Sequence, residues 1–270
     1  KSYEGLFTPA PVPSGYAGQA HDFGSGDIFQ HVTLPAGVYT IVLQWEDNNY
    51  SLGQLPGAAT DLDIYLTDDY GKKYFGFNRD NIGADPIEVM PFSVKGTSVA
   101  NIMIVRKAGN TNVKFKYIVF RGDISIDEYN QGISTCVAQA NAKGAMAVGA
   151  VLYSNTPAFG VSPPTVASFS SRGAENIVDG VTRFKPDFCA PNGVNTSVAM
   201  GGVNIDRDSF PNFFGTSAAA PHAAGVAALL LEAKQKFYGE SMLPSEVKTT
   251  LQSTALDMYT PGYDSLSGAG

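Results

Sequence analysis

The sequence predicts two architectures in succession, an all-β module followed by an α/β portion. Residues 1–123 contain short stretches of alternating apolar and polar residues, separated by Gly, Asn, Asp and Pro, which is typical of an antiparallel β-sandwich. Further on, apolar residues recur with a helical period after residue 217 and again after Pro244. We therefore predict a Pro-rich linker at 1–17, a β-sandwich at 18–123 and an α/β portion at 124–270.

Five stretches of the first module have the alternation expected of strands: residues 38–45, 62–66, 87–92, 102–105 and 114–120. Asn110 lies between the last two, in Lys107-Ala108-Gly109-Asn110, and we expect a hairpin turn there.

Acidic residues cluster around the second of these stretches, at Asp61, Asp63, Asp68 and Asp69. Alternating Asp on a strand end, followed by a loop, could supply oxygen ligands to calcium, which makes Asp61 and Asp63 candidate ligands. The spacing does not match an EF-hand loop, so a solvated acidic turn is the alternative. No cofactor is required by anything else in the sequence.

A helix is predicted directly after Ser217. One apolar face is marked by Val226, Leu229, Leu230 and Ala233, and alanines and a glycine keep its flanks thin, so we expect burial in a core. Pro221 has no amide to donate and suits only a first turn, which places the helix N-terminus close to Ser217. Free amides and the helix dipole would stabilise an oxyanion beside this serine. The alternative is an N-cap serine, which does not explain the small residues around it.

Gly215-Thr216-Ser217-Ala218-Ala219-Ala220-Pro221-His222 resembles the nucleophile motif Gly-Thr-Ser-x-Ala-x-Pro-His of the subtilisin-like serine peptidases, the subtilase family. Three upstream segments match the family in the same order: 134–151, 167–173 and 185–191. The resemblance covers residues 132–270 and implies a secreted or cell-envelope serine endopeptidase that cleaves polypeptides through an acyl-enzyme on Ser217. An ungapped alignment with the family implies that Val137 and Ala140 wall the primary specificity pocket.

The other catalytic residues of that family have no counterpart in the sequence. Members place an Asp, a His and an oxyanion Asn upstream of the strand that corresponds to residues 147–151, and none of those three motifs occurs here. In the family His222 is structural, while His21 and His31 lack the expected neighbours. We therefore expect the missing N-terminal half of the peptidase domain to be a partner, and the chain alone to be nearly inert. A non-catalytic pseudopeptidase, or a scaffold that binds through the β-sandwich, is the alternative.

The first module resembles, less specifically, the jelly-roll domains known as pre-peptidase C-terminal domains, on residues 34–41 and 60–66. The simplest topology is a jelly-roll β-sandwich inserted into a subtilisin-like domain, so that the chain continues into the C-terminal portion of that α/β domain.

The composition and charge argue against nucleic acid and a membrane span. A formal charge of −7 and no basic stripe disfavour nucleic acid. The longest apolar run, 223–231, is too short to span a bilayer. Cys136 and Cys189 allow one disulfide or two buried thiols, and we favour thiols because neither lies in a Cys-rich scaffold.

Overall fold

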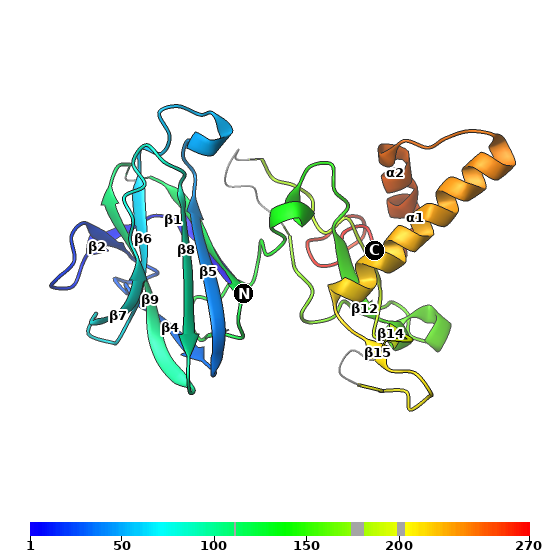
Figure 1. Ribbon diagram of the computed structural model, residues 1–270, viewed down its shortest axis with the longest axis horizontal. Coiled ribbons are helices and arrows are strands. Elements are labelled where there is room, and N and C mark those ends of the chain that lie inside the picture. Colours follow the sequence, from blue (N-terminus) through cyan, green and yellow to red (C-terminus); the bar gives the residue numbers. More distant parts are fainter. Residues whose placement is uncertain (111, 174–180, 199–202) are drawn as a thin grey trace. The chain divides into compact units, whose positions relative to one another are not determined.

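The computed structural model of the chain describes residues 1–110, 112–173, 181–198 and 203–270. It contains two compact units, the first formed by Lys1–Ile133 and the second by residues 134–173 and Thr182–Gly270 (Figure 1).

The first unit is built from two antiparallel sheets. One has the strand order β1 (Ser2–Leu6), β10 (Lys114–Arg121), β5 (Gly37–Trp45), β8 (Ile87–Val94). The other follows the order β11 (Ser125–Ile126), β4 (Gln30–Leu34), β9 (Ser98–Ala108), β3 (Gln19–His21), β2 (Pro9–Pro11), and β9 also pairs with β6 (Asp61–Thr67), which pairs with β7 (Lys73–Phe77). A short helix, η1 (Tyr50–Leu52), follows β5.

One hydrophobic core draws on both sheets. Alternate residues of β5, Ile41, Leu43 and Trp45, are fully buried, and they share this core with residues of β6, β9 and β10 such as Ile64, Ile102 and Phe115. Alternation with period two places these side chains on one face of each strand. The five predicted strands are confirmed, whereas the jelly-roll description of the module stays a prediction.

The N-terminal segment differs from expectation. Residues 1–17 were predicted as a linker, yet β1 pairs with β10 along its whole length and Tyr3 and Phe7 are buried in the core. Two of the three prolines that suggested a linker, Pro9 and Pro11, lie in β2, an edge strand paired with β3 alone, where a missing amide is tolerated. At the other end, β11 pairs with β4, so residues just beyond 123 also belong to the first unit.

The hairpin predicted at Asn110 is wrong. The strands on either side of it, β9 and β10, lie in different sheets, so this segment crosses between the sheets. The Asn110 amide donates to Thr60 Oγ1 at 3.3 Å, and its carbonyl accepts a hydrogen bond of 2.7 Å from Arg106. Strand alternation alone carries no information on which neighbour a strand pairs with.

The second unit is mixed α/β. β12 (Val148–Leu152) and β13 (Phe188–Asn192) form a parallel pair, β14 (Val194–Asn195) and β15 (Asn212–Phe213) an antiparallel one, and two helices follow, α1 (Thr216–Tyr238) and α2 (Pro244–Thr254). Its core packs Ala150, Phe188 and Ala190 of the parallel strands against Ala219 and Ala223 of α1. The short helices η2 (Ala138–Asn141), η3 (Tyr153–Asn155) and η4 (Pro157–Phe159) complete the unit.

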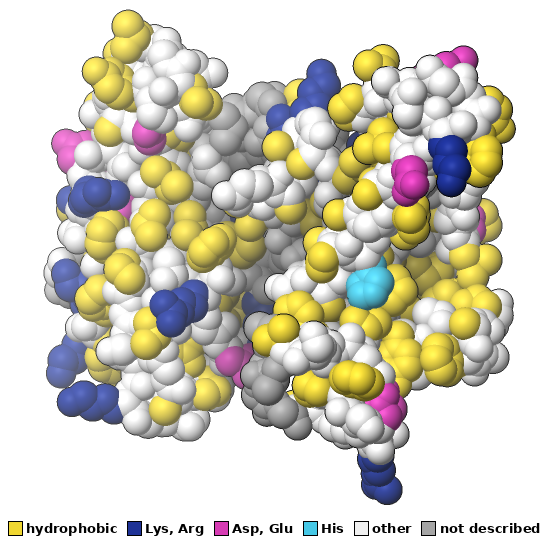
Figure 2. All heavy atoms as spheres, turned by 45° about the vertical axis from the view of Figure 1, so that its right-hand side comes forward, with side chains coloured by type: hydrophobic (Ala, Val, Ile, Leu, Met, Phe, Trp, Pro, Cys, Tyr) yellow, Lys and Arg dark blue, Asp and Glu magenta, His cyan; other side chains and the backbone are white. Residues whose placement is uncertain are grey.

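α1 begins where the sequence predicts, but its apolar face is not buried. Val226 is 52% and Leu229 66% exposed, and burial is confined to Ala218, Ala219 and Ala223 near its start. The 23-residue helix is about 34 Å long, whereas the five-residue strands it packs on span about 17 Å, so its distal turns extend beyond them. Exposed hydrophobic side chains are plentiful on the face of the second unit seen in Figure 2. No helix among the described residues is apolar enough over a sufficient length to cross a membrane.

Candidate active site

Ser217 lies at the N-terminus of α1, directly after the β14–β15 pair. Gly215 caps the helix with φ = 101°, a backbone conformation that glycine adopts without steric cost. Its amide points to Asn192 Oδ1 at 3.5 Å, and its carbonyl accepts the first helical hydrogen bond, from Ala218 at 3.0 Å. The contact between Asn192 and Gly215 joins the end of β13 to the start of α1. The Ser217 side chain is exposed at this point.

The helix start favours negative charge next to Ser217. The amides of Thr216 and Ser217 precede the first intrahelical hydrogen bond and therefore have no acceptor within α1. Together with the helix dipole they favour an anion there. Among the described residues the structure records no hydrogen-bond partner for the Ser217 hydroxyl. The serine is thus accessible and lies next to an oxyanion-stabilising end of a helix, but no described base activates it.

Pro221 lies one turn deeper in α1 than the sequence suggested. It is the sixth residue of the helix, so its ring replaces the amide that would otherwise bond the Ser217 carbonyl. The next residue, His222, donates from Nδ1 to the Ala218 carbonyl at 2.8 Å. Its ring is therefore held by its own helix, in keeping with a structural role.

The two remaining histidines belong to the first unit. His21 is buried among aromatic rings, where Nε2 donates to the Tyr3 hydroxyl at 2.9 Å and Nδ1 accepts from the Thr8 amide at 3.1 Å. Burial lowers the pKa of His21 to about 4, against a smaller opposing effect of Asp22. His31 pairs at the surface with Asp127, 2.9 Å away. Both rings thus have structural partners.

A buried ionic network supports the frame around Ser217. Lys185 Nζ lies 2.7 Å from Asp187 Oδ2, which also accepts the Ala147 amide at 2.7 Å, and Lys248 of α2 pairs with the other oxygen. The Lys185 carbonyl accepts from the Tyr263 hydroxyl at 2.8 Å. The network links the start of β12, the approach to β13 and α2. The sequence motif at 185–191 identified the segment that contains Lys185 and Asp187, but it did not predict their ionic partner Lys248 on α2.

The residues proposed for the specificity pocket lie near η2. Val137 immediately precedes this helix and is half-buried, and Ala140 lies within it and is exposed. Their role stays a prediction. Cys136 and Cys189 are not joined by a disulfide, as predicted. Burial raises the pKa of Cys189 to about 12, so this thiol is uncharged at neutral pH.

The candidate calcium ligands are buried on β6. Asp61 accepts the Asn81 amide at 3.2 Å, and Asp63 accepts the Tyr65 hydroxyl at 2.7 Å. Burial raises the pKa of Asp63 to about 7. In the part of the chain that the structure describes, no three His, Cys, Asp or Glu side chains come together around one metal position. Calcium binding at Asp61 and Asp63 stays a prediction.

Two further aspartates of that cluster serve the following turn. Asp68 caps it by accepting the amides of Tyr70 and Lys72, and Asp69 accepts from Asn101 at 2.9 Å. Their oxygens are used in shaping the loop, as expected of a structural acidic turn.

Comparison with known proteins identifies the family to which the chain belongs. The family model described as "Subtilase family" matches residues 48–270, so the match begins within the first unit and includes all of the second. The chain belongs to the subtilase family.

Individual relatives agree with this assignment. The chain is 29% identical over 171 residues to the Arabidopsis thaliana subtilisin-like protease SBT4.12, covering 61% of this chain and 21% of the relative. It is 37% identical over 112 residues to SBT1.7 and 36% identical over 113 residues to SBT1.4 of the same plant, each covering 38% of this chain and 14% of the relative. The chain thus spans about a fifth or less of the length of these relatives.

Proposed function

We propose that the chain carries the nucleophile of a subtilisin-like serine endopeptidase. The observation that carries the proposal is the position of Ser217, exposed at the start of α1 and without a described hydrogen-bond partner. In this reaction Ser217 Oγ attacks the scissile carbonyl carbon, the peptide C–N bond breaks, and the amine leaves as an ester forms on Oγ. Water then hydrolyses the ester, which frees the acid and restores the serine.

The chain's own contribution is to position the serine and to stabilise charge. As the carbonyl oxygen becomes an oxyanion, the amides at the α1 N-terminus donate to it. The Oγ proton must pass to a base and then to the leaving amine. We propose that an upstream segment supplies this base as a His with its Asp, together with an oxyanion Asn. Loss of the base costs about a million-fold in turnover in subtilisin itself, so the chain alone should be nearly inert.

The exposed side of α1 supports such a partner. Val226, Leu229 and Phe237 are exposed on one side of α1, in a unit whose parallel sheet has two strands among the described residues. Apolar side chains gathered at a surface are typical of an interaction site. The missing N-terminal half of the peptidase domain would cover them.

The finer features predicted from the family belong to the same proposal. The first unit would be a jelly-roll β-sandwich inserted into the peptidase domain, Val137 and Ala140 would line the substrate pocket, and the protein would be secreted or held in the cell envelope. No cofactor takes part in the proposed chemistry, and nucleic acid is not among the proposed partners.

A non-catalytic role is the second candidate, because no described residue activates Ser217. The chain would then be part of a pseudopeptidase, or a scaffold that binds through its first unit.

Fluorophosphonate labelling separates these functions. The probe reacts only with an activated serine, and intact mass identifies the adduct on this chain, on the longer polypeptide from the same reading frame, and on Ser217→Ala versions of both. We expect labelling of the longer polypeptide alone, lost in its Ser217→Ala form. Labelling of the short chain would place a base within it. Absence of labelling in both would favour the pseudopeptidase.

A further inference from the structure

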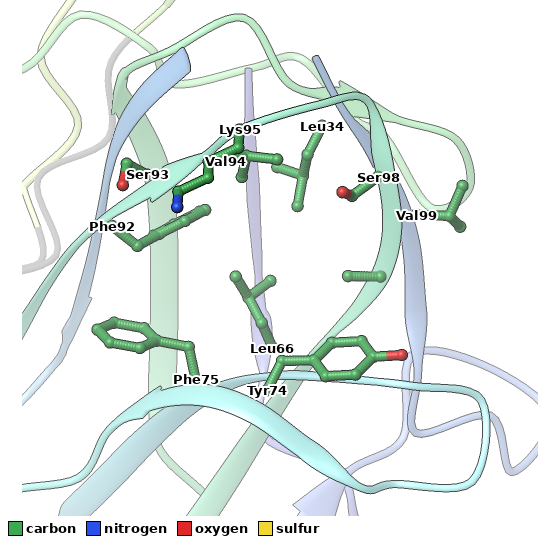
Figure 3. Close-up of a pocket in the computed structure, with 11 residues that line it drawn as sticks. Leu34, Leu66, Tyr74, Phe75, Phe92, Ser93, Val94, Lys95, Ser98 and Val99 are labelled. Atoms are coloured by element: carbon green, nitrogen blue, oxygen red, sulfur yellow. The ribbon is translucent and has the colours of Figure 1, made fainter. Parts of the chain in front are cut away.

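A cavity of about 630 Å³ opens at one end of the first unit, between β7 and the loop that crosses from β8 to β9 in the other sheet. Figure 3 shows Tyr74 and Phe75 on one side and residues 92–99 on the other, with Leu66 projecting between them. The volume is in the range of small-ligand sites, about 300–1,000 Å³. The site lies within a single unit and contains none of the residues around Ser217.

Most side chains that line this cavity are apolar or aromatic, and polar backbone and hydroxyl groups lie between them. Leu34 and Leu66 belong to the buried core, and Phe92 stacks on Tyr39 with ring centroids 5.1 Å apart, which fixes that wall. The Phe75 ring lies 6.0 Å from that of Phe92. Tyr74 remains 60% exposed at the mouth, although burying an aromatic ring of this kind is strongly favourable. A ligand that enters here would cover these rings.

One positive charge faces this apolar space. Lys95 is the only charged residue among the eleven that line the cavity, and no ion pair is recorded for it among the described residues. Its side chain runs across the upper edge of the opening in Figure 3. Of the two serines in the lining, Ser98 already donates to the Gly96 carbonyl at 3.1 Å. The only charge available for recognition in this lining is therefore the Lys95 ammonium.

The strands beside the cavity are edges. β7 pairs with β6 alone, and β8 ends its sheet, where Pro91 offers no amide. An extended backbone can therefore add to β7 more readily than to β8, as in strand addition by peptides.

From these features we propose that the cavity binds the C-terminal end of a peptide. The last two residues of the peptide carry aromatic or aliphatic side chains, which fill the space between Phe75, Phe92 and Leu66. The terminal carboxylate of the peptide pairs with Lys95. A glycan would also stack on aromatic rings, but the single cation at Lys95 and the free edge of β7 favour an occupant with a carboxylate and an extended backbone. The proposal does not depend on the chemistry of Ser217.

The test is a chemical-shift titration of the full 270-residue chain, carrying Ser217→Ala to exclude cleavage. The probes are N-acetyl-Phe-Leu and its C-terminal amide. We expect saturable shifts at Phe75, Phe92 and Lys95, and binding of the acid about two- to five-fold tighter than the amide, the range of an exposed ion pair. Lys95→Gln should remove that preference. Tyr74→Ser should weaken both probes about ten-fold.

Two matched variants control for charge and for loss of a tyrosine. Lys72→Gln and Tyr70→Ser alter exposed residues of the neighbouring turn outside the lining, Tyr70 being 89% exposed, and should leave both affinities unchanged. Equal affinity for acid and amide, shifts that do not saturate, or Tyr74→Ser binding as well as the parent would overturn the proposal. So would saturable binding of maltotriose in place of the dipeptide, which would assign the cavity to a glycan.

Discussion

Lys185 and Asp187 form an ion pair of 2.7 Å in which both side chains are buried. Asp187 also pairs with Lys248, which is partly exposed, and accepts the Ala147 amide. The Asp187 carboxylate thus connects the N-terminal ends of β12 and β13 to α2.

Removing the Asp187 carboxylate should lower the stability of the second unit and leave that of the first unit unchanged. Asp187→Ala leaves the buried Lys185 ammonium without its counter-charge, and we expect a loss of about 3–5 kcal/mol in the free energy of unfolding. Lys248→Gln, which leaves the buried pair intact, should cost about 1 kcal/mol or less. Urea denaturation followed by tyrosine fluorescence and by circular dichroism measures both. A second unit as stable with Asp187→Ala as without it would contradict the assignment.

The left-handed backbone of Gly215 should be required for the geometry of Ser217. A Cβ at this position meets no atom closer than 3.6 Å, so Gly215→Ala tests the φ of 101° and not crowding. We expect a destabilisation of about 1–3 kcal/mol and, in the longer polypeptide, fluorophosphonate labelling slowed roughly ten- to hundred-fold. The matched variant is Gly225→Ala, inside α1 and facing open space, which should stabilise by about 0.5–1 kcal/mol and leave labelling unchanged.

Asp63 should make the first unit less stable as the pH rises. Burial raises its folded pKa to about 7 from an ordinary value near 4, so the folded state holds the proton more tightly. The resulting stabilisation is complete below about pH 4 and is lost as the pH rises toward 7. Asp63→Asn should flatten this slope and raise stability at pH 8 by about 1–3 kcal/mol. Thermal unfolding from pH 4 to 8 measures it, and parallel profiles for the two proteins would refute the prediction.

His21 should produce the opposite slope. Its folded pKa of about 4 lies below the unfolded value near 6.5, so stability is complete above about pH 6.5 and is lost as the pH falls toward 4. His21→Gln should remove about 2 kcal/mol of this acid sensitivity. His31→Gln is the control, because His31 pairs with Asp127 at the surface, and this variant should retain the acid sensitivity. Neither substitution should affect labelling of Ser217 in the longer polypeptide, and a loss there would implicate a histidine of the first unit in catalysis.

The exposed side of α1 should matter for assembly and not for the stability of this chain. Leu229→Gln replaces a side chain that is largely exposed, so unfolding should change by about 0.5 kcal/mol or less. If an upstream segment covers α1, the same change should weaken its association with this chain about ten-fold or more, as for a buried leucine. Co-purification of the two separately expressed pieces, with Lys236→Gln as a surface control, tells these outcomes apart.

Much of the fold was predictable because long strands and helices carry their own pattern. Alternation located β5, β6, β8, β9 and β10, and the apolar period after Ser217, together with Pro221, located the start of α1. Short or Pro-containing strands such as β2 carry too few residues for a period to be recognised.

What could not be predicted depends on contacts between distant residues. A helical period shows which side chains of α1 share a face, but not what covers them, so Val226 and Leu229 were expected inside and lie outside. The role of Lys248 could not be predicted, because it depends on Asp187, far away in sequence. The cavity at Lys95 arises where edge strands of two sheets meet, and strand assignments alone do not predict it.

The order of the two units along the chain sets the order in which they are synthesised. The first unit closes its sheets once β10 and β11 have left the ribosome, before any of α1 has been translated. At about 5–20 residues per second, Ser217 follows the end of that unit by roughly 4–17 s. The first unit therefore has several seconds in which to close its sheets before the residues around Ser217 are synthesised.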